Sequence, residues 1–377
     1  MDKKPVPRIY KTLRKHLNTL PVRFPKSFTG VELQLLMDLF TEEEAETACL
    51  LSEKFRTPEE IAAEAQETPP LVIENRLQEM AKKGSVFYRE QNNTYALMPL
   101  VVGIYEFQVN RMNKDFADKI FSYGIQSFGL EYMTTSKRQS RIIPIEKSVD
   151  AKTKVPSYDE LEALIRKSEG RIAVLECVCR KAKDLREDPC KATDRRELCL
   201  SLGDYADTVI RNNWGRKVSA EEALEISREN QKEGLVLQAA NVQEPEFICG
   251  CCGDCCGLLG MAKFFPRPAD FIVSGHLCTA DSDKCISCGI CVKKCPMDAI
   301  VFDKKGRIQV KEGRCIGCGA CVTFCPKSAL SLESRNDREA PVQTTDQLWQ
   351  ELKKKQRSLP EKLLIGLKGI LGFKNRL

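Results

Sequence analysis

The chain has 377 residues, of which 42% are hydrophobic and 30% are charged, and its formal net charge is +6. This length predicts two or three domains with cores of their own, and the composition is that of an ordinary soluble protein. No apolar run approaches the roughly 18 residues that a membrane-spanning helix needs, and so thin a positive charge does not by itself indicate nucleic-acid binding. The first 20 residues carry charge but no apolar secretory segment, which predicts a cytoplasmic protein with reduced thiols.

Nineteen cysteines stand against two histidines, His16 and His276. With so few histidines, histidine acid–base catalysis and histidine-based metal sites have almost no candidates. The sequence also contains no glycine-rich dinucleotide loop after a strand and no P-loop. The chemistry that can be inferred therefore rests on the cysteines.

Residues 28–100 predict three helices followed by a hairpin. Thr41 and Thr57 each begin a capping box that starts one of the first two helices, and Pro70 opens the third. The alternating segment after the third helix predicts two strands that turn at residues 92–93. This order of three helices and a two-stranded wing resembles a winged helix-turn-helix domain, in which the third helix enters the DNA major groove.

The third helix of this region makes a weak case for DNA binding. Its exposed side carries basic and amide residues, namely Asn75, Arg76, Gln78, Lys82 and Lys83. The same side also carries Glu74 and Glu79, whose carboxylates would repel phosphate. We therefore expect this domain to serve packing or partner docking, and we do not expect nucleic acid as a partner.

Residues 101–268 predict a small α/β middle domain with cysteine-rich loops. Residues 101–135 are expected to be helical, with a long mixed stretch over 109–128, and the basic segment at 137–141 is expected to be a solvated linker. The pattern that follows predicts a strand, a helix and a strand at 141–145, 159–168 and 171–176. The second of these strands leads directly into cysteines.

Nine cysteines crowd the loops of this middle domain: Cys177, Cys179, Cys190, Cys199, Cys249, Cys251, Cys252, Cys255 and Cys256. Such thiols would be reactive unless they were bound, and their crowding predicts a third iron–sulfur cluster. Its ligands are either the first four of these cysteines or one of the first two together with the later group, and nine cysteines could hold two clusters. Tetrahedral zinc and a redox-active dithiol are the alternatives. Cys49, isolated on a helix, is expected to be a small buried hydrophobic residue.

Residues 285–326 carry the pattern C-x2-C-x2-C-x3-C-P twice, at an offset of 30 residues. The eight cysteines are Cys285, Cys288, Cys291 and Cys295, followed by Cys315, Cys318, Cys321 and Cys325. A third cysteine at the same short step is more than a zinc site needs, and three sulfurs on a tight loop suit three irons of a cubane. The spacing therefore predicts two [4Fe-4S] clusters.

This segment, about 269–335, resembles the bacterial two-cluster ferredoxin. The resemblance implies low-potential transfer of single electrons, and it implies that the fourth cysteine of each motif binds the other cluster. One cluster would then use Cys285, Cys288, Cys291 and Cys325, and the other would use Cys315, Cys318, Cys321 and Cys295. Cys278 is expected to be a strand residue near a cluster rather than a ligand, and residues 299–310 predict a hairpin.

The order of motifs, C-x-C-R, then C-x-C-C-x2-C-C-G, then the doubled motif, resembles a poorly characterised group of large ferredoxin-like proteins from anaerobic bacteria and archaea. This resemblance implies an electron-transfer role in an anaerobe. Residues 336–377 predict a polar linker and an amphipathic C-terminal helix with basic residues around its apolar face. That helix is expected to pack on its own chain or a partner, with peripheral contact with an anionic membrane as the alternative.

Together these features predict a multidomain α+β protein that passes electrons through two [4Fe-4S] clusters, and a third, to a redox partner or an oxidoreductase complex. Two alternatives belong to other functional classes. The first is an oxidoreductase that binds substrate at a middle-domain cluster, and the second is a redox-sensing winged-helix transcription regulator.

Overall fold

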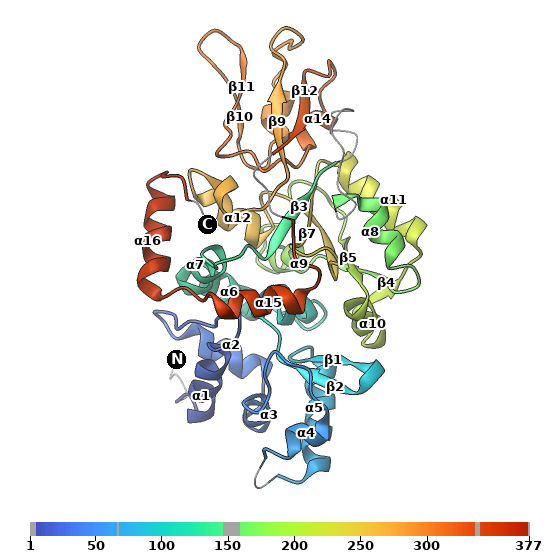
Figure 1. Ribbon diagram of the computed structural model, residues 1–377, viewed down its shortest axis with the longest axis vertical. Coiled ribbons are helices and arrows are strands. Elements are labelled where there is room, and N and C mark those ends of the chain that lie inside the picture. The colour runs from blue at the N-terminus through green and yellow to red at the C-terminus, as the bar shows by residue number, and fades with distance from the viewer. Residues whose placement is uncertain (1–4, 66–67, 146–158, 336–339, 376–377) are drawn as a thin grey trace.

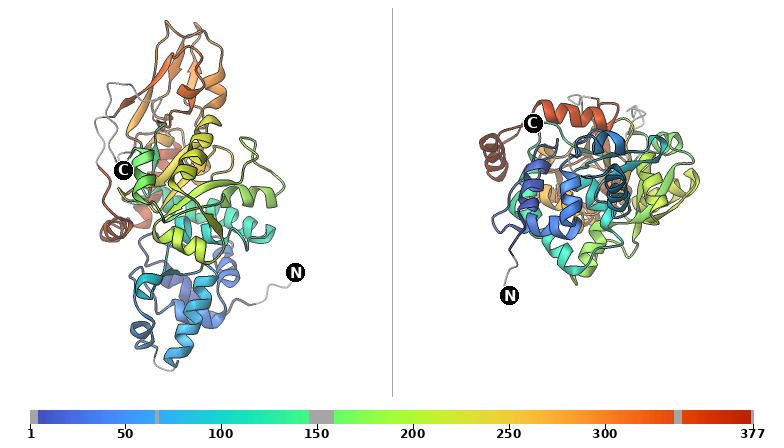
Figure 2. Two further views of the ribbon diagram at one scale, coloured as in Figure 1. Left: turned by 90° about the vertical axis from the view of Figure 1, so that its right-hand side faces the viewer. Right: turned by 90° about the horizontal axis from the view of Figure 1, so that it is seen from below.

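The computed structural model describes residues 5–65, 68–145, 159–335 and 340–375. The chain mixes helices and strands, as predicted for an α+β protein. Figure 1 shows three parts along the long axis: a helical N-terminal part, a sheet with helices in the middle, and the doubled-motif segment at the far end. The views in Figure 2 show the same elongated arrangement from two further sides.

The N-terminal part consists of short helices and one hairpin. Its elements are α1 (Arg8–Leu17), α2 (Val31–Leu39), α3 (Glu42–Ala48), α4 (Pro58–Ala62), α5 (Pro70–Lys82), β1 (Phe87–Arg89) and β2 (Thr94–Ala96). Thr41 and Thr57 form the predicted capping boxes at the starts of α3 and α4. β1 and β2 pair antiparallel, with Tyr88 opposite Tyr95, as the alternating pattern predicts. The helices α1 and α2 lie before the predicted set and had no clear start signal.

The predicted helical region at 101–135 consists of several short segments. They are η2 (Leu100–Ile104), η3 (Glu106–Gln108), α6 (Lys114–Tyr123), η4 (Gly124–Phe128) and α7 (Gly129–Met133). Within η2 the backbone of Val101, Val102 and Gly103 is not helical. The Asn113 side chain accepts a hydrogen bond from the Phe116 N–H at 2.8 Å and so caps the start of α6. These segments pack against the N-terminal part, where the Tyr123 hydroxyl donates to the Pro25 carbonyl at 2.8 Å.

A six-stranded sheet forms the centre of the molecule. Its strands are β3 (Ser140–Ile143), β4 (Ile172–Glu176), β5 (Glu197–Leu202), β6 (Gly215–Lys217), β7 (Val236–Ala240) and β8 (Phe247–Cys251). They lie in the order β3-β7-β8-β5-β4-β6, and every neighbouring pair is antiparallel. Five helices accompany the sheet: α8 (Leu161–Lys167), α9 (Val178–Leu185), α10 (Asp204–Arg211), α11 (Ala220–Lys232) and α12 (Gly257–Phe264).

The two faces of this sheet pack against different helices. Ile172 and Val174 of β4 share a core with α8 and α11, whereas Ala173 and Leu175 join the core that contains α10 and the N-terminal part. This division follows from the strand period of two, which points alternate side chains to opposite faces. Cysteines on β5 and β8 that point to the second face are therefore enclosed between the sheet and the N-terminal part.

The basic segment at 137–141 is not the solvated linker that its charge predicts. Arg141 lies within β3, and its side chain is fully buried against Asp159, with Nε 3.0 Å from Oδ1. Arg138 donates hydrogen bonds to the Asp270 carbonyl, at 3.1 Å from Nη2. The prediction of a solvated linker rested on charge alone. It is wrong because the guanidinium groups of Arg138 and Arg141 have carboxylate or carbonyl partners inside the fold.

The doubled-motif segment is a compact unit of short elements. They are β9 (His276–Ala280), α13 (Ile290–Lys294), β10 (Ile300–Phe302), β11 (Ile308–Val310), α14 (Ala320–Thr323) and β12 (Leu330–Ser334), preceded by η7 (Pro268–Asp270). β9 pairs antiparallel with β12, and β10 pairs with β11 in the predicted hairpin. Each motif thus forms a loop and a short helix between two strands.

Two helices follow the doubled-motif segment, α15 (Thr345–Lys354) and α16 (Leu359–Ile370). In Figure 1, α15 runs across the middle of the molecule and α16 stands along its left side. α16 is oriented opposite to what its amphipathic pattern suggests. Lys362, Gly366 and Gly369 face the protein, while its large apolar side chains are exposed. Lys362 is buried in an ion pair with Glu131 of α7.

None of the helices in the described ranges is long and apolar enough to cross a membrane.

Candidate metal centres

The eight cysteines of the doubled motif surround two cavities. One cavity is lined by Cys285, Cys288, Cys291 and Cys325, and we call it the outer cavity. The other is lined by Cys295, Cys315, Cys318 and Cys321, together with Cys278, and we call it the inner cavity. Each cavity thus brings together three cysteines of one motif and the fourth cysteine of the other. These are the two sets of four that the ferredoxin resemblance implies.

Backbone amides point at the sulfurs of both cavities. The Ala299 N–H donates to the Cys295 sulfur and the Ala329 N–H donates to the Cys325 sulfur, each at 3.2 Å, at positions 30 residues apart. The Cys278 N–H donates to the Cys315 sulfur at 3.4 Å. Thiolates that bind iron retain such hydrogen bonds, which tune the potential of a cluster. These donors and the enclosed shape of each cavity fit a [4Fe-4S] cluster, whose chemistry is one-electron transfer.

The two cavities differ in exposure. Cys288 at the outer cavity is exposed, and its neighbour Ile286 is 57% exposed. At the inner cavity, by contrast, Cys315, Cys318 and Cys321 are all buried. The inner motif is covered by the segment before β9, where Ser274 lies against Gly317, and by Ile145 after β3, whose N–H donates to the Cys318 carbonyl at 3.2 Å.

The nine middle-domain cysteines separate into two groups. We call the first the six-cysteine ring: Cys177, Cys179, Cys199, Cys249, Cys251 and Cys256. In the order Cys179, Cys177, Cys199, Cys249, Cys251 and Cys256, each thiol lies close enough to the next to shift its pKa, and Cys256 in turn influences Cys179. We call the second the three-cysteine site: Cys190, Cys252 and Cys255, with Asp254 beside them.

Strand pairing builds the six-cysteine ring. Cys249 and Cys251 are two residues apart on β8, so both point to the same face of the sheet. Cys199 comes from the adjacent strand β5, and Cys177 and Cys179 come from the junction of β4 with α9. Three strands that are neighbours in the sheet thereby deliver five of the six thiols to one place, and Cys256 at the start of α12 supplies the last.

The thiols of the ring influence one another strongly. Hydrogen bonds from Cys179 and Cys199, together with the charge of Arg180, hold the pKa of Cys177 well below its usual range. Hydrogen bonding to Cys199 raises the pKa of Cys249, and burial adds to the increase. A buried set of thiols that share protons in this way would release them on binding a metal or a cluster.

Arg180 lies between the ring and the three-cysteine site. Its side chain is fully buried; Nε donates to the Cys190 sulfur at 3.3 Å and Nη1 donates to the Gly250 carbonyl at 2.8 Å. Its Nη2 has no hydrogen-bond partner among the described residues. A buried guanidinium with an unused donor suits a neighbouring anionic group, such as a cluster sulfide or a thiolate.

Proton-bearing side chains also lie beside the ring. Burial raises the pKa of Glu106 to about 8, although its Oε2 accepts a hydrogen bond from the Gly103 N–H at 2.7 Å. Burial likewise raises the pKa of Tyr105, and the charges of Cys179 and Cys177 add to this increase. A carboxyl group that is largely protonated at neutral pH is unusual, and such groups concentrate at functional sites.

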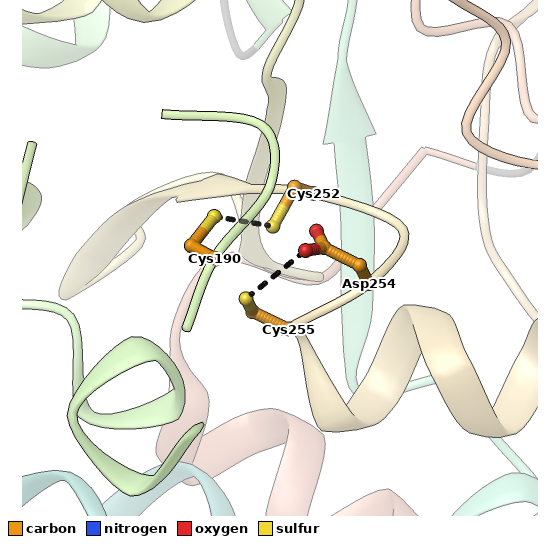
Figure 3. A group of neighbouring side chains, drawn as sticks. All are labelled: Cys190, Cys252, Asp254 and Cys255. Carbon is orange, nitrogen blue, oxygen red and sulfur yellow. Dashed lines mark hydrogen bonds between the residues drawn. The ribbon is translucent and has the colours of Figure 1, made fainter. Parts of the chain in front are cut away.

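The three-cysteine site joins two loops. Cys190 lies in the loop after α9, and the other residues lie in the turn between β8 and α12. Figure 3 shows the three sulfurs and the Asp254 carboxylate pointing toward one another. The Cys190 and Cys252 sulfurs are 3.7 Å apart, and the Cys255 sulfur is 3.5 Å from Asp254 Oδ2.

The turn of the three-cysteine site touches the inner motif directly. Gly253 faces the backbone of Pro296, the residue after Cys295, so closely that a Cβ on Gly253 would lie 2.7 Å from the Pro296 carbonyl oxygen. Lys263 of α12 and Asp298 form an ion pair at 3.0 Å across the same boundary. The middle-domain cysteines and the inner cavity therefore lie in adjacent, packed segments.

The sequence identified all the cysteines of these centres, but not their grouping. The Cys190 sulfur lies beside that of Cys252, but Cys190 also belongs to the same buried cluster as Cys177, against which Cys179 and Cys199 pack. The sequence-based set of these four cysteines therefore stays a prediction. The structure also adds Asp254 and Glu106, which had not been singled out. An aspartate inside the C-C-G-D-C-C run was a visible signal for the first, whereas nothing local marked Glu106. Cys49 is a half-buried thiol whose pKa burial raises to about 11, and Cys278 lies on β9 with its sulfur 3.6 Å from that of Cys321.

Comparison with known proteins identifies one segment of the chain. The profile of the 4Fe-4S dicluster domain family matches residues 284–329, which include all eight cysteines of the doubled motif. The chain therefore contains a ferredoxin-like iron–sulfur module. No curated protein and no solved structure matches the chain.

Proposed function

We propose that this chain is an electron-transfer protein that carries single electrons between the outer cavity and the cysteines of the middle domain. The contact between Gly253 and Pro296 carries this proposal, because it leaves only packed backbone between the inner motif and the turn that leads into Cys256 of the six-cysteine ring. Iron–sulfur clusters bound in the two cavities would supply the one-electron chemistry. We also propose a cytoplasmic location, since these thiols must stay reduced to bind them.

The surface around the outer cavity supports contact with a redox partner there. Cys288 is exposed, and four exposed lysines surround the motif: Lys284, Lys293, Lys294 and Lys327. Lys284 is engaged by Asp281 at 2.9 Å. A basic rim around an exposed apolar centre suits a donor with an acidic surface, and such complementarity mainly accelerates association. The partner would dock where Ile286 is exposed.

The six-cysteine ring supports a third iron–sulfur cluster. It gathers six thiols and an arginine with an unused buried donor, which is more ligand capacity than one metal ion needs. Iron and acid-labile sulfide measured on anaerobically purified protein, together with Mössbauer spectra, test this proposal. About twelve irons per chain would support a third cubane, and about eight would limit the clusters to the ferredoxin-like module.

The path of electron transfer can be tested by removing the clusters of the ferredoxin-like module selectively. Cys285→Ser combined with Cys315→Ser should impair both module clusters and leave the ring cysteines intact. The middle-domain cluster should then lose its fast reduction by a protein donor in stopped-flow experiments. Cys49→Ser is the matched control, because Cys49 lies in the N-terminal part. Unchanged reduction kinetics in the double variant would contradict the proposed path.

A second candidate function is reduction of a small substrate at the six-cysteine ring. The observation that favours it is the carboxyl group of Glu106 beside the ring, since reduction of most organic substrates also requires protons. A substrate-dependent change in the electron paramagnetic resonance of one cluster would support this function. Spectra that ignore added metabolites would favour transfer alone.

Regulation of transcription is the weaker alternative, because the basic residues of α5 are already engaged. Lys83 pairs with Glu44 at 2.5 Å, Lys82 pairs with Glu79 at 2.8 Å, and Arg76 contacts the Glu43 carbonyl at 3.4 Å. A DNA-reading helix would need these charges for phosphate. Salt-dependent retardation of duplex DNA in either redox state would revive this alternative.

A further inference from the structure

We propose that Cys190, Cys252, Cys255 and Asp254 form a tetrahedral site for a single zinc ion, separate from the iron–sulfur centres. This inference goes beyond electron transfer, because zinc has no redox chemistry and its role here is to hold two loops together. The proposal rests on the distances among the four side chains, on the contrast with the ferredoxin-like cavities, and on the groups that surround the site.

The distances match the edges of a zinc tetrahedron. With Zn–S of about 2.3 Å and Zn–O of about 2.1 Å, the S···S edge is about 3.8 Å and the S···O edge is about 3.6 Å. The Cys190 and Cys252 sulfurs are 3.7 Å apart, and the Cys255 sulfur and Asp254 Oδ2 are 3.5 Å apart. All four ligand atoms lie within 4.8 Å of one another. Two of the six edges thus match the tetrahedron, and one ion bound between the four atoms would bring the remaining pairs to similar distances.

The ferredoxin-like cysteines are arranged differently. They line cavities, because a cubane places an iron in front of each sulfur and so holds the sulfurs apart. At the three-cysteine site, by contrast, the ligand atoms of Cys190, Cys252, Asp254 and Cys255 all lie within 4.8 Å of one another. Among the described residues, no other group of three or more cysteine, histidine or acidic side chains converges in this way. The same chain therefore displays an open arrangement at its cluster motifs and a closed one at this site.

Neighbouring groups complete the site. The Lys191 N–H donates to Asp254 Oδ2 at 2.9 Å, and Arg180 Nε donates to the Cys190 sulfur at 3.3 Å. Such outer contacts orient metal ligands and are a regular feature of zinc sites. Three thiolates and a carboxylate around Zn²⁺ carry two negative charges, and the buried Arg180 guanidinium offsets one of them. Burial of the remaining charge is limited because Asp254 is exposed.

The site links the loop after α9 to the turn between β8 and α12. That turn contains Gly253, which packs on Pro296, and it leads into Cys256 of the six-cysteine ring. A zinc ion here would fix the position of the turn relative to both. The proposed ion therefore supports the junction between the middle domain and the ferredoxin-like module without carrying electrons itself.

Metal analysis of the full-length protein tests this inference. We expect close to one zinc per chain alongside the iron, and we expect Cys252→Ser and Asp254→Asn to lower the zinc content while the iron and sulfide stay unchanged. Cys49→Ser is the control and should retain the zinc. Co²⁺ offers a test that needs no variant, because tetrahedral thiolate coordination gives strong charge-transfer absorption and visible ligand-field bands on addition of Co²⁺ to zinc-depleted protein.

Two results would overturn the inference. One is loss of about four irons and four sulfides, instead of zinc, in Cys252→Ser, which would assign these cysteines to a cluster. The other is wild-type protein that carries no zinc and gives no tetrahedral Co²⁺ spectrum. The first result would also move the third cluster from the six-cysteine ring to a set that includes Cys252. The electron-transfer function proposed above is judged separately, by total iron content and by the reduction kinetics of the Cys285→Ser, Cys315→Ser variant.

A second inference comes from the exposed face of α16. We propose that this face binds an anionic lipid surface. Seven large apolar side chains of α16 and the turn after it are between 52% and 63% exposed: Leu359, Leu363, Leu364, Leu367, Ile370, Leu371 and Phe373. Phe264, at the end of neighbouring α12, is 76% exposed. The helix can present this face only because its glycines supply the contact with the protein, at Leu130 for Gly366 and at Phe271 for Gly369.

The positive charge around this apolar face favours an anionic lipid surface as its binding partner. Between residues 353 and 375 the chain has seven basic residues and one acidic residue. Lys368 and Lys374 are exposed beside the apolar side chains, whereas Lys362 is already neutralised by Glu131. Apolar side chains flanked by lysines are what an interfacial helix needs to bind anionic lipid.

Sedimentation with vesicles tests the lipid proposal. The protein should bind vesicles that contain phosphatidylglycerol and should bind pure phosphatidylcholine far less, and added salt should weaken the binding. Leu363→Glu with Leu367→Glu should abolish it, whereas Leu71→Glu, at an exposed leucine of α5 in the N-terminal part, should not. Absence of binding, or equal binding by the double variant, would refute the proposal. So would self-association without vesicles that the double variant removes, since the face would then belong to a second copy.

Discussion

Gly317 and Ser287 occupy equivalent positions in the two cysteine motifs. Exchanging the two residue types separates the cost of a left-handed backbone from the cost of steric overlap at the inner motif. Both residues have left-handed backbone conformations, with φ of +60° and +54°. For residues other than glycine this conformation costs roughly 1–2 kcal/mol, and Ser287 shows that the motif tolerates that cost. A serine at position 317 therefore differs from the natural Ser287 mainly in the atoms that would surround its side chain.

The surroundings of the two positions are different. A Cβ at residue 317 would lie 2.5 Å from Ser274 Oγ and 2.6 Å from the carbonyl carbon of His276, and closer still to the carbonyl oxygen. Relief of this overlap requires a shift of about 1 Å at the start of β9, which is paired with β12. Overpacking of this kind costs typically about 1–3 kcal/mol, and the left-handed backbone adds to it. We expect a total loss of roughly 2–5 kcal/mol at the inner motif.

The assay compares Gly317→Ser with Ser287→Gly for iron content, sulfide content and thermal midpoint under anaerobic conditions. Gly317→Ser should lose about four irons, which belong to the inner cavity, and should melt at a lower temperature. Ser287→Gly should keep all its iron, with a change in stability within about 1 kcal/mol. If Gly317→Ser retains full iron and the wild-type melting temperature, the close packing of the His276 backbone against Gly317 is refuted.

Three further predictions concern buried groups. Arg141→Leu leaves the Asp159 carboxylate buried without this guanidinium, so unfolding should become easier by about 3–5 kcal/mol in chemical denaturation, and a loss below about 1 kcal/mol would contradict the buried pair. Burial raises the pKa of Glu246 to about 7, above its unfolded value of about 4.3, so its stabilising contribution is present at low pH and lost as the pH rises toward 7. Glu246→Gln should therefore flatten the fall in thermal midpoint between about pH 4 and pH 7, and an unchanged slope would assign that fall to other groups. Cys278→Ala should retain the iron of the inner cavity, because the amide of residue 278, and not its thiol, donates to the Cys315 sulfur; loss of about four irons would make Cys278 a ligand.

Local signals in the sequence were sufficient for some parts of the fold. The capping boxes at Thr41 and Thr57 and the alternating pattern of the hairpin depend on residues within a few positions of each other, and the structure contains them. The doubled cysteine motif is also local, apart from the exchange of Cys295 and Cys325 between the two cavities. These features could be predicted because the physical contacts that produce them are short in sequence.

Other features depend on contacts between distant segments. The six-cysteine ring exists because β4, β5 and β8 are neighbours in the sheet, and no spacing in the sequence encodes that order. Lys362 and Arg141 are buried because Glu131 and Asp159 reach them from other elements. Charge and amphipathic pattern predicted exposure for these side chains, and the long-range partners reversed the outcome.

The unequal covering of the two cavities has a consequence for the module as a whole. Its two halves repeat the same five ligand and proline positions, so a free module of this kind would be close to symmetric and would have no inherent direction. Here β9 and the middle domain cover one half, and Cys288 remains at the surface of the other. Covering one half changes the solvation of that cluster alone, and solvation is one of the factors that set cluster potential. The surrounding chain thus makes two equivalent sites different from each other. This difference can favour one direction of electron flow, which the repeated motif does not do by itself.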